Sequence, residues 1–228
     1  MDLSTTALEP AGAVTTLPGK LGALCGLGFA LSLFVGVAML NTPRKATDQE
    51  LITWWSDGSH RTTAIVSMEL FVVAGLCFLA FLSALRSTLL AAEGGTGQLT
   101  ALVGAAGVVF VAMLFVAAAA RGLIAFAVES PANGEPLPGP DTLRYAPQIG
   151  YAITGTGGMA AAALTMAGVS WLTIRTAAFG RWLAWVGAAA TAIVVIASAL
   201  LSGVFAIPAL SVWALATSVA LWRRASQP

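Results

Sequence analysis

Long apolar runs separated by short polar stretches dominate the hydrophobic pattern of this 228-residue chain. A bilayer core about 30 Å thick needs about 20 apolar residues per helix, so each run of that length predicts one transmembrane helix. The stretch between Trp182 and Trp222 is too long for one span. Ser202, Gly203 and Pro208 supply the break that makes it two. Six transmembrane helices are therefore predicted, at residues 21–40, 62–85, 99–126, 148–172, 182–201 and 205–222.

Polar segments flank this region at both ends. The leader, residues 1–20, lacks the basic start and cleavage site of a signal peptide, so we expect it to be retained as a flexible cytoplasmic segment. Residues 223–228 form a short tail, and residues 21–222 form a single transmembrane domain. The fold class expected is all-α, a six-helix membrane bundle.

Composition supports a membrane solvent. Hydrophobic residues make up 58% of the chain and charged residues only 9%, whereas a soluble domain carries about 25% charged residues. The net charge of +1 gives no basic field that would favour nucleic acid. The lipid bilayer is therefore the one partner predicted outright, and the pattern leaves the oligomeric state open.

Lysine and arginine positions predict the orientation, because short cytoplasmic loops carry an excess of both. With the amino terminus placed in the cytoplasm, more of them fall on the inner side than on the outer side. The inner six are Lys20, Arg86, Arg175, Arg181, Arg223 and Arg224, and the outer four are Arg44, Lys45, Arg61 and Arg144. We therefore expect a multi-pass protein of the cell membrane with both termini in the cytoplasm.

Two long connections, residues 41–61 and 127–147, then lie outside. In the first, Thr47 and Glu50 have the spacing of a capping box, which predicts a short interfacial helix ending near Gly58. We expect it to lie flat at the outer surface, with Trp54 or Trp55 against lipid or the bundle rim. The second is rich in proline and glycine, which predicts an irregular, turn-rich loop.

Few residues of the chain suit catalysis or metal binding. The single histidine, His60, excludes a histidine-rich zinc site, and no paired cysteines replace it. Asp57, Ser59 and His60 are packed into one short loop, where they cannot align as a catalytic triad. Cys25 and Cys77 lie in apolar runs, where a thiol packs as a small hydrophobe. We predict no catalytic residue, no metal and no cofactor.

Ionisable residues inside spans are costly, so they are candidate functional residues. Glu69 and Arg121 qualify, and each lies about eight residues below the outer end of its helix. They are predicted either to form a structural ion pair or to line an outward-facing pocket; in a third interpretation Arg121 reaches the headgroups and hydroxyl neighbours hold Glu69. The predicted ligand-binding residues of the pocket are Glu69, Arg121, Tyr145, Tyr151 and Thr154.

Small residues predict where helices approach one another inside the membrane. Gly22 and Gly26 form a G-x-x-x-G pattern in the first helix, and Gly104 and Gly107 thin the third. We expect these faces to point into the bundle.

Three stretches carry a resemblance to a known family: Glu50–Arg61, Phe78–Arg86 with the following Glu93 and Gly94, and Gly180–Gly187. With these motifs the chain resembles a family of six-helix bacterial membrane proteins, common in actinobacteria and catalogued only as a domain of unknown function. Relatives often have a proline where this chain has Gly180. The resemblance implies six helices and supplies no activity and no functional residue.

Three functions are therefore compared. The first is non-enzymatic binding of a small amphiphile or lipid in the outer half of the bundle, or service as an accessory membrane subunit. The alternative is a secondary transporter of a small molecule, which would need a pathway across the bundle and usually has helices broken near the midplane, with Pro208 as the interior candidate for such a break. An intramembrane enzyme that modifies lipid is disfavoured by the shortage of histidine, aspartate and cysteine at depth.

Overall fold

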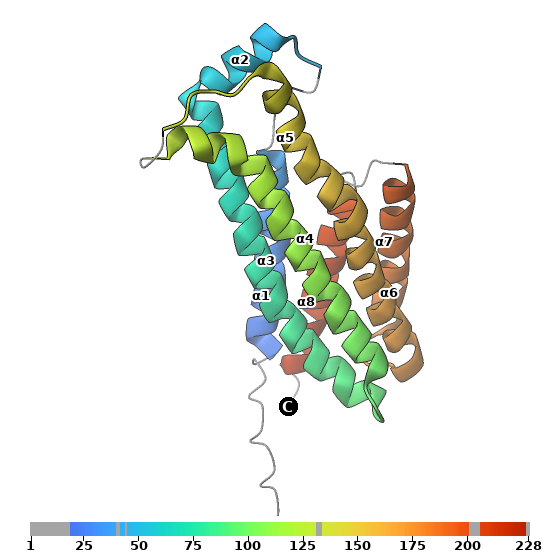
Figure 1. Ribbon diagram of the computed structural model, residues 1–228. Helices are drawn as coiled ribbons and strands as arrows, with labels where there is room; N and C mark the ends of the chain where they lie inside the picture. Colours follow the sequence, from blue (N-terminus) through green and yellow to red (C-terminus); the bar gives the residue numbers. More distant parts are fainter. Residues whose placement is uncertain (1–18, 40–41, 44, 131–133, 201–205, 227–228) are drawn as a thin grey trace, which may run out of the picture.

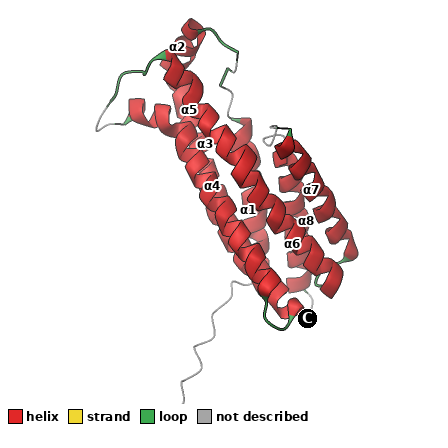
Figure 2. Ribbon diagram, turned by 45° about the vertical axis from the view of Figure 1, so that its right-hand side comes forward, coloured by secondary structure: helices red, strands yellow, loops and turns green. Residues whose placement is uncertain are grey.

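A computed structural model describes residues 19–39, 42–43, 45–130, 134–200 and 206–226. Every regular element in these ranges is a helix (Figure 2), which confirms the all-α class. The elements are α1 (Gly19–Ala38), α2 (Asp48–Ser56), α3 (Gly58–Glu93), α4 (Gln98–Glu129), α5 (Pro140–Ile153), the π-helix η1 (Thr154–Gly158), α6 (Met159–Thr176), α7 (Arg181–Ala199) and α8 (Ile207–Ala225). Most of the predicted leader, residues 1–18, lies outside the described ranges.

Five helical stretches in the described ranges are long and apolar enough to cross a membrane. They are α1, α3, α4, the continuous stretch Pro140–Thr176 and α7. Helix α8 occupies the place of the sixth predicted span but is not among the five. The membrane class is thus supported by five helices, and the count of six stays a prediction.

The long helices pack into one bundle (Figure 1). Helix α1 lies against α3 and α8, α4 lies against α3 and α6, and α7 lies between α6 and α8. We call the end that carries α2 the α2 end, and the end that carries the α6–α7 turn and the last turn of α8 the arginine end. Both Gly19 and Ala225 lie at the arginine end (Figure 1).

Small residues bring the helices together, as their positions predict. A side-chain carbon on Gly22 would collide with Ala84 of α3, and one on Gly26 would collide with Phe81 and with Ser218 of α8. The G-x-x-x-G face of α1 therefore points into the bundle, as expected. Such close backbone approach replaces the hydrophobic driving force that lipid removes.

Other glycine contacts locate the middle of the bundle along the helix axes. Helix α1 has 20 residues and is about 30 Å long, close to the thickness of a bilayer core. Near its centre, Gly28 faces Cys77 of α3, and Gly75, half a turn away, faces Phe115 of α4. The middle of the bundle therefore lies near Cys77 and Phe115, and depths elsewhere follow at about 1.5 Å per residue.

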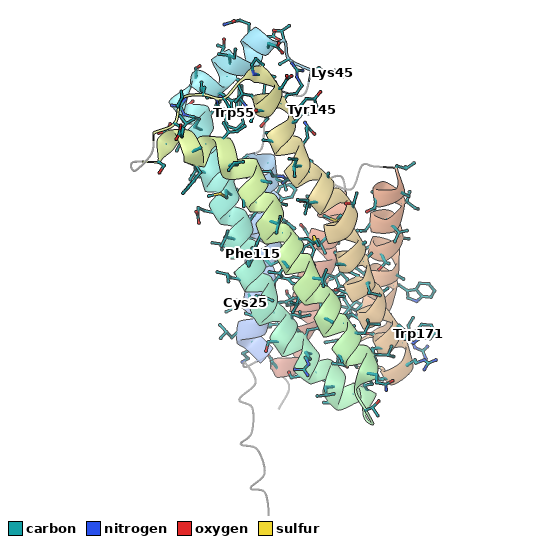
Figure 3. The ribbon with its side chains drawn as sticks, viewed as in Figure 1. Cys25, Lys45, Trp55, Phe115, Tyr145 and Trp171 are labelled. Carbon is teal, nitrogen blue, oxygen red and sulfur yellow. The ribbon has the colours of Figure 1, made fainter. Side chains whose placement is uncertain are left out.

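A separate cap stands at the α2 end. Helices α3 and α4 have 36 and 32 residues, so they extend past α1 and past a bilayer core. Their ends join α2 and α5 in a second apolar cluster, distinct from the main core and made of Trp55, Ala64, Ile124, Ala125, Leu143 and Ala146. The side chain of Trp55 points from α2 toward the long helices (Figure 3) and is 1% exposed. It therefore packs against the bundle rim, as predicted for Trp54 or Trp55.

Two arginines connect the helices of this cap through ion pairs and hydrogen bonds. Arg61 Nε donates to Glu129 Oε1 at 2.5 Å and Arg61 Nη1 donates to the Trp55 carbonyl at 2.6 Å, which joins α2, α3 and α4. Arg144 Nη2 donates to Asp48 Oδ1 at 2.6 Å, which joins α5 to the first turn of α2. These ion pairs fix the position of α2 across the top of the long helices.

The connection between the third and fourth predicted spans is only partly irregular. The prediction of a turn-rich loop over residues 127–147 is wrong from Pro140 onward, because α5 begins there. Proline at the first helical position costs no intrahelical hydrogen bond, because the backbone N–H there has no partner within the helix. The negative charge of Asp141 in the first turn interacts favourably with the helix dipole. Pro147 lies within the helix and is buried, so packing of that face overrides its unfavourable local effect.

Proline also begins α8. Pro208 lies in its first turn, where its ring is compatible with the helix, so this candidate for an interior break does not break a helix. Ser202 and Gly203, which were predicted to help form the turn, lie outside the described residues.

Candidate functional site

Arg121 is the one charged residue among the described positions that is buried in the bundle. It lies six residues beyond Phe115 on α4, hence about 9 Å from the middle of the bundle toward the α2 end. Its Cζ atom lies 5.1 Å from the ring centre of Phe71 and 4.2 Å from that of Tyr151. The guanidinium is thus held between an aromatic ring of α3 and one of α5, an arrangement that stabilises a desolvated cation.

Close packing against α5 completes the surroundings of Arg121. A side-chain carbon on Gly150 would lie 2.5 Å from Arg121 Cγ and 2.7 Å from the Ala117 carbonyl oxygen. Only glycine therefore lets α5 approach α4 at this level. Arg121 therefore packs against Phe71, Tyr151 and the α5 backbone at Gly150.

Glu69 does not pair with Arg121. Its depth matches, because Gly122 next to Arg121 packs against Met68, but Glu69 is exposed on the outer face of α3. Among the ion pairs of the described residues none involves Glu69. The prediction that both residues face the bundle interior is therefore wrong for Glu69.

Helix geometry explains this outcome. Ser67 and Phe71 are buried one turn apart on α3, and Ser67 Oγ donates to the Gly36 carbonyl of α1 at 2.7 Å. Residue 69 lies about 200° around the helix from each of them. It shares instead the outer stripe of Val73 and Leu76, both exposed.

The three remaining predicted residues differ in their positions. Tyr145 lies on α5 (Figure 3), where its side chain is 61% exposed. Tyr151 contacts Arg121, and Thr154 is buried one turn further along, where its hydroxyl donates to the Gly150 carbonyl of its own helix at 2.9 Å. The structure thus brings Arg121 and Tyr151 together, with Thr154 next to them. A ligand-binding role for the five residues stays a prediction.

A π-helical turn, η1, interrupts the fourth span directly after Ile153. The sequence Thr-Gly-Thr-Gly-Gly of η1 lies beside Met113 of α4, at about the middle of the bundle. π-Helical turns inside α-helices occur frequently at functional sites. The sequence analysis missed this feature, and its signal was the three glycines within four residues.

An open hollow lies on the cap between the loop before α2, α2 itself and the first turn of α3. Its volume is about 760 Å³, within the usual range for small-molecule sites. Charged or aromatic side chains line it at Lys45, Glu50, Trp54, Asp57 and His60. We call it the α2 hollow. Lys45, one of its lining residues, lies beside α2 (Figure 3).

The walls of the α2 hollow are held by local hydrogen bonds. Thr47 and Glu50 form the predicted capping box of α2, in which Glu50 Oε2 accepts from the Thr47 backbone N–H at 2.7 Å. That bond, followed by the one from the Thr47 hydroxyl, holds the pKa of Glu50 below its usual value. Asp57 caps α3 in the same way, and the backbone N–H of Ser59 lowers the pKa of its carboxyl.

An aromatic plate forms the remaining wall. The rings of Trp54 and His60 stack at 4.4 Å with an interplanar angle of 4°, and His60 Nδ1 lies 3.0 Å from the Trp54 carbonyl oxygen. The sequence analysis considered Asp57 and His60 only as members of a catalytic triad, which it excluded. It overlooked the hollow that both residues line, because the loop before α2 that closes the hollow cannot be placed from sequence.

No group of three histidine, cysteine, aspartate or glutamate side chains suited to a metal occurs within the described residues. Cys25 and Cys77 are free thiols, each half-buried at the surface of the main core. Comparison of the chain with protein-family models, with curated protein sequences and with solved structures found no match.

Proposed function

We propose that the chain is a non-enzymatic membrane protein of six spans that binds a small amphiphile through its polar group in the α2 hollow. The hollow is the observation that carries this proposal. It combines an aromatic plate, two carboxylates and one lysine in a space of about 760 Å³.

The lining favours a polar group that carries an amine. Glu50 and Asp57 are carboxylates with lowered pKa values, so both stay ionised to low pH. The face of Trp54 attracts cations. Lys45 adds one positive charge at the edge, which suits a zwitterionic group whose anionic part lies beside it.

The position of the hollow suits an amphiphile. His60 lies 17 residues above Cys77 on α3, hence about 25 Å from the middle of the bundle. That is close to the outer limit of the headgroup layer of a bilayer about 40–45 Å thick. A ligand with an apolar part would reach the hollow from the membrane surface.

In the orientation we propose, the α2 end lies outside the cell. Lys20, Arg86, Arg175, Arg181, Arg223 and Arg224 all gather at the other end, where the positive-inside rule places the cytoplasm. The hollow then faces the extracellular side.

Secondary transport is the second candidate, and η1 favours it. Transporters place their substrates where spanning helices are interrupted near the midplane. The π-helical turn of Thr154–Gly158 is such an interruption at mid-depth. A transporter would show substrate-dependent flux in proteoliposomes, which a binding protein would not.

Native mass spectrometry of gently purified protein tests the binding proposal. The wild type should retain a small amphiphile, and Trp54→Ala should lose it because one face of the aromatic plate is removed. Trp171→Ala is the matched control, since Trp171 is a half-exposed tryptophan on α6 far from α2 (Figure 3). Retention of the same molecule by both variants, or its absence from the wild type, would contradict the proposal.

A further inference from the structure

A second hollow, of about 610 Å³, lies at the arginine end between the α6–α7 turn and the last turns of α8. Three guanidinium groups line it, those of Arg181, Arg223 and Arg224, together with the rings of Phe179 and Trp182. Among the described residues that line it there is no carboxylate. We call it the arginine hollow.

The α6–α7 turn is held rigidly by its own packing. Ala177 ends α6 at a positive φ of 52°, and Ala178 and Phe179 are buried against the main core. Arg224 Nη1 donates to the Ala178 carbonyl, which ties the end of α8 to the turn. The walls of the hollow are therefore fixed by the protein itself.

The charged side chains at the α2 end form ion pairs, whereas those of the arginine hollow form none among the described residues. The ion pairs of the described residues, His60–Asp57, Arg61–Glu129 and Arg144–Asp48, all lie at the α2 end. Glu93, the acidic residue at the other end of α3, accepts hydrogen bonds from Thr100 and Leu99 in the first turn of α4. Among the residues that the structure describes, no carboxylate pairs with these three arginines, and their like charges repel one another.

The start of α7 adds to the positive field. Its cap residue, Gly180, has no side chain that could accept from the first backbone N–H groups. An anion in the hollow would meet these donors and the positive end of the helix dipole, in addition to the guanidinium forks that match phosphate oxygens.

We propose that the arginine hollow binds the phosphate-bearing headgroup of an anionic phospholipid. Trp182 is 44% exposed and Trp185, one turn further along α7, is 76% exposed, so an apolar track leads from the hollow along the outer face of α7. Acyl chains can lie on this track while the phosphate contacts Arg181 and Arg223. Free inorganic phosphate shares the headgroup chemistry but would make no use of the track.

Native mass spectrometry in a neutral detergent with added phosphatidylglycerol or phosphatidylcholine tests the proposal. The wild type should retain phosphatidylglycerol in preference to phosphatidylcholine. The Arg181→Gln, Arg223→Gln double variant should lower the affinity for phosphatidylglycerol by about tenfold or more, because two charge-assisted contacts are removed.

Arg86→Gln with Arg175→Gln is the matched control. It removes the same charge from the same end, but both residues are exposed outside the hollow, and Arg175 stacks on Trp171 at 4.7 Å. The control should keep the preference of the wild type. An equal loss in both double variants would show diffuse attraction and overturn the proposal, as would equal retention of the two lipids by the wild type.

Two further measurements use the wild type alone. Inorganic phosphate should not displace phosphatidylglycerol, and displacement at matched concentration would overturn the lipid assignment in favour of a free anion. A photoactivatable phosphatidylglycerol should crosslink to residues 177–182 or 220–224, and crosslinks confined to other segments would overturn the site.

Discussion

Replacement of Gly150 by alanine should separate α5 from α4 and destabilise the protein. The new methyl group would lie 2.5 Å from Arg121 Cγ and 2.7 Å from the carbonyl oxygen of Ala117. A side chain can shift, but the Ala117 carbonyl belongs to the backbone of α4, so the helices themselves must move. Overpacking of this kind costs about 1–3 kcal/mol, opposed by about 0.8–1.0 kcal/mol from the better helix propensity of alanine.

Gly104→Ala provides the matched control. Gly104 lies inside α4, and a methyl group there would come no closer than 3.9 Å to Arg86 Cδ. The propensity gain is the same in both variants, so the difference between them isolates the steric term of about 1–3 kcal/mol.

Thermal unfolding in detergent at a fixed scan rate measures this difference. For a chain of 150–250 residues each kcal/mol corresponds to about 2–4 °C, so Gly150→Ala should melt several degrees below Gly104→Ala. Identical midpoints would refute the packing of α5 on Arg121.

Three other predictions follow from the structure. In a variant without the native cysteines, Ala46→Cys should react with a membrane-impermeant thiol reagent from outside intact cells and Thr96→Cys should not; the reverse pattern would invert the proposed orientation. The destabilisations by Glu69→Gln and Arg121→Gln should add within about 0.5 kcal/mol in a double-mutant cycle, because Glu69 is exposed on the outer face of α3 whereas Arg121 is buried inside the bundle. A larger coupling would contradict the position of Glu69. The pKa of Glu50 is lowered on folding, so its capping interaction is fully present above the unfolded pKa and is lost as pH falls through the lower folded pKa. Hydrogen exchange of the α2 backbone amides should therefore accelerate over that pH interval. An unchanged exchange rate would exclude the Glu50 carboxylate as part of the cap.

The sequence predicts the all-helical membrane class of this protein well, because hydropathy depends on each residue alone and five described helical stretches are apolar and long enough to cross a membrane. It predicts poorly which side of a helix faces the bundle interior and which side faces lipid, and Glu69 shows why. In lipid both faces of a helix are apolar, so the stripe of Val73 and Leu76 looks as suitable for the interior as that of Phe71. The usable signal was residue size, since Ser67 and Ala74 on the buried face are small.

The candidate sites were harder still to predict. Capping of α2 by Thr47 and Glu50 is a local pattern and is confirmed. The α2 hollow and the arginine hollow each join segments distant in the sequence, such as Ala178 and Arg224, whose contact depends on the tertiary fold. Depth alone placed Arg121 correctly in the buried part of α4, but nothing local indicated Phe71 or Tyr151 as its neighbours.

The π-helical turn also sets the rotational register of the fourth span. A π-turn holds one residue more than an α-turn, since its hydrogen bonds span five residues instead of four. Deleting one residue from Thr154–Gly158 would restore a regular helix and rotate α5 by about 100° relative to α6. Gly150 and Tyr151 would then turn away from Arg121 although no residue in contact with it had changed, so a one-residue insertion or deletion at mid-membrane can open or close the surroundings of the buried cation.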